Sequence, residues 1–439
     1  MSATASLAAA SVRARPSAFA GTFAALVFSG AVVTACVSVA VSAAGAPPVD
    51  GDTGLSEMGV GFSLVSVYLS VFVIAQAVSL AVAQRHRESA LLRAVGAEPR
   101  QIRRMVAAEA LAAALLALPV GYGLGALLAE AWFRGMDRQG LVPEGVVLHI
   151  GLWPLLAAFG VLLVSSQLGG LAGAWRASRT RPAAVLTRSQ VQGGERPGAV
   201  RGLASLVFLG GAVALTAAAG AGSAEDAGSE IPLVLLAYMV AIGLAGPWIG
   251  RLATAVAAPL LRGCCGVAGE LAVAGSRARS RRLSSAITPI ALVTAFAVAK
   301  LVSLTGSGDP AWMDVFGTLL YAGFAGLVAA NTLVMLTLER LREFSLLRVV
   351  GAGRRRIVAV VLAEGAITAL AGAGAGVFAA CAVMVPLGPK TGTPLSGLPG
   401  WVWAVSLSGC AALVWTASCA PLGHLLRVRP LAGLARRSV

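Results

Sequence analysis

Charge is scarce in this sequence. Asp, Glu, Lys and Arg make up only 12% of the 439 residues, whereas soluble globular proteins carry about 25%. Hydrophobic residues account for 57%, and the mean hydropathy is +0.83. A chain this apolar can expose such a surface only to lipid, so the composition excludes a soluble globular protein and predicts a membrane protein.

Acidic residues are scarcer than basic residues. The 19 Asp and Glu against 34 Lys and Arg leave a net charge of +15. Nucleic-acid binding is one explanation of such an excess. The basic residues, however, occur in short clusters between long apolar runs and form no extended basic face. This placement follows the positive-inside rule of membrane proteins, so we expect no nucleic-acid partner.

Residues that hold metals, nucleotides or catalytic protons are also few. The three histidines and six cysteines are scattered through or beside apolar segments, and no CxxC pair with metal-ligand partners occurs. The nearest approach to a phosphate-binding loop, at residues 388–391, lacks its upstream glycine because Val383 occupies that place. We therefore predict no catalytic site, no metal site and no cofactor, and we expect ATP to be bound by a partner chain.

Long apolar runs are what the sequence has instead. Segments of about twenty apolar residues can cross a membrane, and about ten occur. They lie near residues 17–44, 58–83, 105–133, 150–175, 202–221, 231–250, 284–306, 311–337, 359–386 and 401–424. The first is longer than the apolar core of a signal peptide, so we expect a retained helix. The stretches near 176–201 and 262–283 are polar, and we expect them to be connections. The fold class is thus an all-α membrane protein.

The charges predict how these spans are oriented. If the spans alternate from a cytoplasmic N-terminus, nearly all Lys and Arg fall on the cytoplasmic side. The exceptions are Arg134, Arg138 and Lys390 outside, and Lys300 within a span, where it either reaches the headgroups or lines a path for an anionic substrate. Both termini are then cytoplasmic, and the short outer connections leave no large extracellular domain.

An internal repeat is the most informative pattern. Segment 87–109 (RESALLRAVGAEPRQIRRMVAAE) and segment 342–364 (REFSLLRVVGAGRRRIVAVVLAE) align without a gap and are identical at more than half of their positions. Matched basic clusters flank the spans on both sides. The repeat predicts a 4 + 2 + 4 arrangement: a first four-helix unit (1–190), a spacer with two helices (191–263) and a second four-helix unit (264–439). An even number of spans separates the copies, so they are parallel, unlike the inverted repeats of many secondary transporters.

Each copy of the repeat predicts a short amphipathic helix, a glycine turn and a second helix. Leu91, Leu92 and Val95 form an apolar face, Gly96 suits a helix C-cap, and Pro99 suits a first helical position. The helix either lies among lipid headgroups or docks onto a partner. Two matched copies on the cytoplasmic side favour a twofold cytoplasmic partner.

Two further features are matched in the repeat. Glu109 and Glu364 lie at inner span ends, where we expect them to meet the helix dipole or to pair with nearby arginines. Gly121 and Gly376 are equivalent in the same gap-free alignment and belong to small-xxx-small patterns, which predict close helix contacts.

At these residues the sequence resembles the FtsX-like permease family, which includes the MacB-type and BceB-type transmembrane subunits of ABC transporters. The family hallmark is similar to RE-x-x-LLR-x-VGA, which residues 87–97 and 342–352 match. Asn331 is similar to an asparagine that the family often has before this motif, and Gln76 stands in the first copy. The MacB and BceB types carry a large extracellular domain that we do not expect here, so their substrates are not carried over.

The resemblance implies the permease subunit of an ABC transporter in a bacterial plasma membrane. A separate cytoplasmic ATPase, two copies per chain, would drive export or extraction of a lipophilic or amphipathic substrate. The ATPase-binding residues implied are Arg87, Glu88, Leu91, Leu92, Arg93, Gly96, Arg342, Glu343, Leu346, Leu347, Arg348 and Gly351. A non-transporting signalling or mechanotransmission subunit is an alternative, and an ion-coupled secondary carrier is a weaker one.

Overall fold

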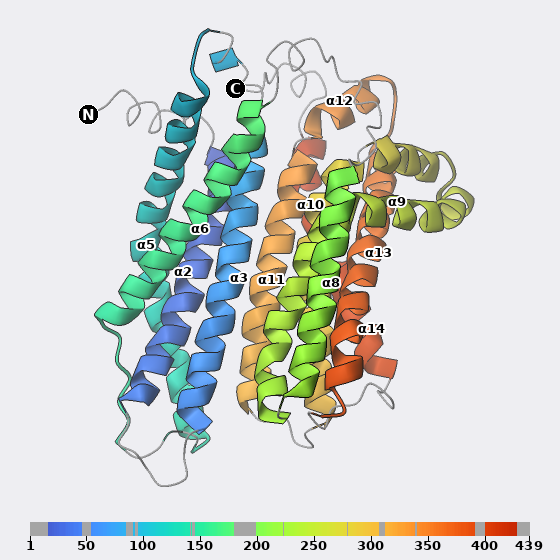
Figure 1. Cartoon of the computed structure of the whole chain (residues 1–439). Helices are drawn as coiled ribbons and strands as arrows, with labels where there is room; N and C mark the ends of the chain where they lie inside the picture. The colour runs from blue at the N-terminus through green and yellow to red at the C-terminus, as the bar shows by residue number, and fades with distance from the viewer. Residues whose placement is uncertain are drawn as a thin grey trace. The chain divides into compact units, whose positions relative to one another are not determined.

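The structure is a computed structural model that describes residues 16–45, 54–84, 91–92, 95–140, 142, 145–179, 199–222, 224–278, 280–306, 312–338, 340–390 and 400–427. Within these ranges the regular secondary structure is entirely helical (Figure 1). The chain divides into two compact units, residues 1–191 and 192–439.

The first unit is a bundle of four long helices: α2 (Pro16–Ala44), α3 (Gly54–Gln84), α5 (Pro99–Arg138) and α6 (Leu152–Arg179). Helix α2 packs against the other three, and α6 also packs against α3 and α5. Leu26, Ile74, Ile102 and Leu162, one from each helix, lie in its buried core.

The second unit contains α8 (Ala199–Ala221), α9 (Ala224–Ala278), α10 (Ser280–Gly306), α11 (Trp312–Leu338), α12 (Leu341–Val349), α13 (Arg354–Leu387) and α14 (Gly400–Arg427). Four of these, α10, α11, α13 and α14, pack in the same pairs as α2, α3, α5 and α6. The internal repeat therefore extends from the sequence to the packing of whole helices.

Most of these helices can cross a membrane. Nine of the described helices are long and apolar enough, and the count reaches ten if α11 and α12, which meet at a bend of 45°, are one bent span. The expectation of an all-α, multi-pass chain is confirmed. The 4 + 2 + 4 grouping, the lack of a large extracellular domain and the domain boundaries stay predictions.

The two helices expected as a spacer belong to the second unit, where α8 packs against α9 and both contact α13. Arg201 of α8 donates hydrogen bonds to the Leu244 carbonyl at 2.9 Å, the Gly243 carbonyl at 2.9 Å and the Ser284 hydroxyl at 3.1 Å. Pro247 has no N–H for the Gly243 carbonyl one turn earlier, so that carbonyl needs another donor. Arg201 supplies it and ties α8 to α9.

The polar stretch near 262–283 is not a plain connection. Helix α9 continues to Ala278 and reverses at Gly266, which has a φ of 51°. The two arms lie side by side: Val273 packs with Ala257, and a Cβ built on Gly269 would collide with the Leu261 carbonyl. In Figure 1 this hairpin extends sideways beside α13.

A run of small residues explains the α9 hairpin. Ala268 and Ala272 pack against Val360 and Ala363 of α13, whereas the charged residues of the hairpin face outward. Counting charges alone hides this buried alanine face, which is why composition indicated a polar connection.

Glycines permit the closest helix contacts in both units. A Cβ built on Gly125 would lie 2.6 Å from the Ala31 carbonyl oxygen of α2, and one built on Gly376 would lie 2.6 Å from the Ala291 carbonyl oxygen of α10. Gly121, which the gap-free alignment pairs with Gly376, makes a similar approach: a Cβ built on it would lie 2.9 Å from the Val27 carbonyl oxygen of α2. Both glycines of the matched pair therefore lie at a close helix contact, as the small-xxx-small patterns predict.

Candidate functional site

The glycine turns of the two repeat copies have the same backbone geometry. Gly96 and Gly351 have φ values of 104° and 98°. The N–H of Ala97 donates to the Leu92 carbonyl at 2.9 Å, and the N–H of Ala352 donates to the Leu347 carbonyl at 2.9 Å. These bonds and the left-handed glycine define a Schellman C-cap. The C-cap prediction is confirmed in both copies.

The next helix also begins alike in both copies. Glu98 and Gly353 are the N-cap residues of α5 and α13. Their carbonyls accept the N–H three residues later at 3.0 Å and the N–H four residues later at 3.2 Å, in each copy. Glu98 and Gly353 differ in chemistry, so the turn is fixed by the glycine before it rather than by the cap residue.

The described part of the first copy exposes its apolar residues. Leu91, Leu92 and Val95 are 54%, 42% and 89% exposed. Three of the implied ATPase-binding residues, Arg87, Glu88 and Arg93, lie outside the described residues.

The second copy separates its two leucines. Leu346 and Val350 are exposed, at 47% and 87%, whereas Leu347 is partly buried. Glu343 and Gly351 are exposed and Arg348 is partly buried. The backbone of Arg342 belongs to α12, and its side chain lies outside the described part.

Helix α12 is held against the membrane-spanning helices by its inner face. Phe344 is buried in a cluster with Ile357 and Val361 of α13 and Leu422 of α14, and Leu347 packs against that cluster. Sequence reasoning treated Leu346 and Leu347 as one apolar face. The structure turns Leu347 toward its own unit and leaves Leu346 exposed.

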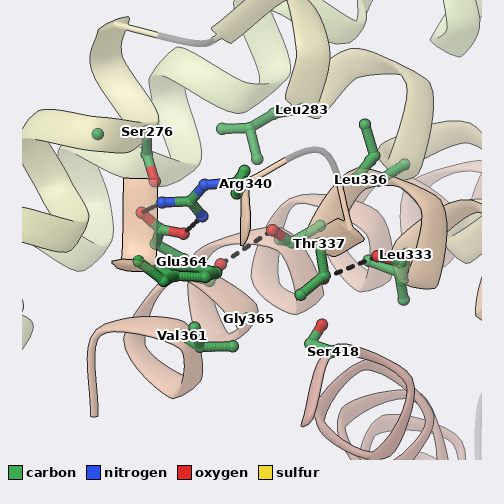
Figure 2. Close-up of a pocket in the computed structure, with 14 residues that line it drawn as sticks. Ser276, Leu283, Leu333, Leu336, Thr337, Arg340, Val361, Glu364, Gly365 and Ser418 are labelled. Atoms are coloured by element: carbon green, nitrogen blue, oxygen red, sulfur yellow. Dashed lines mark hydrogen bonds and ion pairs between the residues drawn. The ribbon is translucent and has the colours of Figure 1, made fainter. Parts of the chain in front are cut away.

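A partly buried ion pair lies next to α12. Both terminal nitrogens of Arg340 donate to the carboxylate of Glu364, the Nη2–Oε1 distance being 2.9 Å (Figure 2). The Arg340 Nε also donates to Glu343 at 3.3 Å, and its guanidinium lies 4.9 Å from the centre of the Phe344 ring. The pairing of Glu364 with an arginine is thus confirmed. Because Glu364 lies about three turns into α13, it is beyond the reach of the helix dipole.

A small cavity adjoins this ion pair. It has a volume of about 80 Å³ and lies between α9, α10, α11, α13 and α14. Arg340 and Glu364 are themselves part of its lining, which otherwise is apolar except for the hydroxyls of Ser276, Thr337 and Ser418 (Figure 2) and of Thr368. Ser276 is buried, and its hydroxyl has no hydrogen-bond partner among the described residues.

In each unit a hydrogen bond links the last two helices of the repeated four-helix set, α14 to α13 and α6 to α5. The Trp415 indole N–H donates to the Leu362 carbonyl at 3.3 Å, and the Gln167 amide donates to the Ala107 carbonyl at 3.1 Å. Each acceptor precedes the matched glutamate, Glu364 or Glu109, by two residues. Sequence reasoning missed this contact because Trp415 and Gln167 share no chemistry beyond an N–H donor.

Among the described residues, no group of three or more His, Cys, Asp or Glu side chains could hold a metal ion. The arrangement found instead, in each unit, is an exposed apolar turn at the end of long apolar helices.

Repeated bundles of membrane-length helices, each bearing such a turn, define a multi-pass membrane protein. The FtsX-like permease C-terminal model matches the chain twice, over residues 60–182 and 315–430. The chain therefore belongs to the FtsX-like permease family, whose members are membrane components of transporters rather than enzymes. Family members normally pair with a cytoplasmic ABC ATPase. No curated protein matches this chain significantly.

Proposed function

We propose that this chain is the permease subunit of an ABC transporter that couples ATP hydrolysis by a separate cytoplasmic ATPase to export or extraction of a lipophilic or amphipathic substrate. The observation that carries the proposal is the matched pair of exposed turns. Each presents leucine and valine side chains at the end of a bundle whose helices are otherwise suited to lipid. Exposed apolar clusters of this kind mark contacts with another molecule.

Basic residues surround each turn. Arg100 and Arg104 are exposed beside the first, and Arg354, Arg355 and Arg356 beside the second. The positive-inside rule assigns such residues to the cytoplasmic side, where an ATPase would dock. Leucine anchors with a charged rim are typical of protein interfaces, in which buried apolar groups supply affinity and rim charges supply association rate.

Two turns in one chain suit a pair of ATPase copies. Because an even number of predicted spans separates the two copies of the repeat, both copies have the same orientation, and both turns are expected on the same side of the membrane. An ATP-driven closure of the two ATPase copies would then displace both turns together. The substrate class follows from the resemblance to the family.

The test is capture of the ATPase from native membranes with a tagged chain. Changing the three exposed leucines, Leu91, Leu92 and Leu346, together to Asp should abolish capture of the ATPase while the membrane abundance of the chain is unchanged. The matched control is Val147→Asp, because Val147 is also an exposed apolar residue, at 66%, on the connection between α5 and α6. Wild-type capture by the triple variant would mean that the turns lie among lipid headgroups instead.

A further inference from the structure

We propose that Arg340 is a positioning residue, whose ion pair with Glu364 ties the docking helix α12 to the membrane-spanning helix α13. The joint makes α12 and α13 move as one body when a partner displaces α12. This inference rests on the proposed function, because it names the connection through which a docked ATPase would act on the membrane helices.

Covalent connection alone leaves α12 free to swing. The helix contains nine residues, and an isolated helix of that length is only marginally stable in water. It joins α13 through Gly351, Ala352 and Gly353, and a Cβ built on either glycine would find no described atom within 4 Å. The orientation of α12 relative to α13 therefore depends on side-chain contacts between the two helices.

The Arg340 guanidinium makes a polar contact between the two helices. It forms two parallel bonds to the Glu364 carboxylate in α13, and it contacts Glu343 and Phe344 in α12. A two-bonded arginine–carboxylate pair constrains direction as well as distance. Together with the apolar contacts of Phe344, this side chain holds both helices in a defined relative geometry.

Burial makes the joint hard to open. The side chains of Arg340 and Glu364 are 19% and 11% exposed. Breaking such a pair leaves an uncompensated buried charge, so a displaced α12 is expected to carry α13 with it rather than separate from it. The adjacent cavity, where the Ser276 hydroxyl has no hydrogen-bond partner among the described residues, is large enough for several water molecules.

The sequence repeat predicts a second joint in the first unit. The gap-free alignment that pairs Glu109 with Glu364 also pairs Arg85 with Arg340. Arg85 lies outside the described residues. Glu109 follows the Ala107 carbonyl, which accepts a hydrogen bond from Gln167, by two residues, just as Glu364 follows the Leu362 carbonyl, which accepts one from Trp415.

The first experiment uses the full chain without an ATPase. Spin labels are attached at Val349→Cys and Leu370→Cys, two exposed positions of α12 and α13, after the six native cysteines are replaced by alanine. Glu364→Gln should broaden the measured distance distribution, and exchanging the charges (Arg340→Glu with Glu364→Arg) should restore a narrow one. An unchanged distribution in Glu364→Gln overturns the proposal.

Two further variants separate a joint from a general folding role. Glu343→Gln removes the exposed carboxylate that Arg340 also contacts and should leave the distribution narrow; broadening to the Glu364→Gln level would overturn the assignment to Glu364. Arg340→Met with Glu364→Leu removes both charges but keeps the volume, a change that buried ion pairs often tolerate. This double variant should fold and still show the broad distribution, and a narrow one would overturn the proposal.

The second experiment uses the complex with the ABC ATPase captured from native membranes. Trapping the complex with ATP and vanadate should leave the distance between the two labels unchanged in the otherwise native chain and should change it in Glu364→Gln, with equal ATPase capture. A nucleotide-dependent distance change without the mutation would overturn the rigid joint. Failure to capture any ATPase would contradict the proposed function instead and would leave the first experiment intact.

Discussion

Gly376 of α13 lies directly against Thr294 of α10, since a Cβ built on the glycine would stand 2.7 Å from the threonine Cβ. The same relationship joins Gly125 of α5 to Thr34 of α2, at 2.6 Å. The contacts of α13 with α10 and of α5 with α2 thus share one form, a glycine packed against an Ala-x-x-Thr segment. Small residues at helix crossings allow this close approach in membranes.

We predict that Gly376→Ala destabilises the second unit, because the added methyl would meet the Ala291 carbonyl oxygen as well as Thr294. Overpacking of this kind costs about 1–3 kcal/mol. The measurement is the thermal midpoint of the detergent-purified chain. Gly374→Ala on the same helix is the control, since no described atom lies within 4 Å of its added Cβ and alanine is the better helix former. Equal midpoints for the two variants would contradict the close contact.

A second prediction concerns the glycine turn. Gly351→Ala forces a side chain into the left-handed region, at a cost of roughly 1–2 kcal/mol, and should loosen the end of α12. Capture of the ATPase should fall while the chain still inserts. Gly353→Ser is the matched change two residues later, where φ is −68° and serine is a good N-cap. Capture by Gly353→Ser should stay at the native level, and a loss as large as that of Gly351→Ala would mean that the conformation of Gly351 is irrelevant.

The two leucines of α12 should behave differently when each is changed alone. Leu346→Asp places a charge on an exposed position and should weaken ATPase capture with little effect on the thermal midpoint. Leu347→Asp places a charge against the cluster of Phe344, Ile357 and Leu422 and should lower the midpoint as well. The two quantities are measured on the same preparations. If Leu346→Asp lowers the midpoint as much as Leu347→Asp, the outward orientation of Leu346 is wrong.

These differences mark where sequence reasoning stops. Apolar runs predict the long helices because each run must be long enough to cross lipid, and a glycine after Leu92 or Leu347 predicts a C-cap because few other residues tolerate a positive φ. Neither rule says which of two adjacent leucines faces its own unit. That depends on where α13 and α14 lie beneath α12.

The polar contacts were the hardest to anticipate. Arg340 lies just before the aligned segment 342–364, and its partner Glu364 is on the next long helix. The distribution of charges therefore predicts that Glu364 pairs with an arginine, but it does not identify Arg340 as that arginine. The α9 hairpin was missed for a similar reason, because its alanine face carries no strong hydropathy signal. In both cases the decisive information is the position of a neighbouring helix.

A double-mutant cycle tests the bond between α8 and α9. Arg201→Ala should lower stability by about 1.5–3 kcal/mol, the usual range for hydrogen bonds to charged groups. Pro247→Ala restores an N–H that can bond the Gly243 carbonyl within α9. In that background Arg201→Ala should cost less, because one acceptor of the arginine is already satisfied. Purely additive effects on the free energy of unfolding would show that Arg201 does not compensate for the proline.

The last prediction concerns the sidedness on which ATPase docking depends. Val147 and Val350 are 66% and 87% exposed, and the count of spans assigns them to opposite sides of the membrane. In a chain whose native cysteines are replaced, Val147→Cys should react with a membrane-impermeant maleimide in intact cells. Val350→Cys should react only after permeabilisation, because the basic residues beside it are kept on the cytoplasmic side. Labelling of Val350→Cys in intact cells would place the second turn outside, where a cytoplasmic ATPase could not reach it.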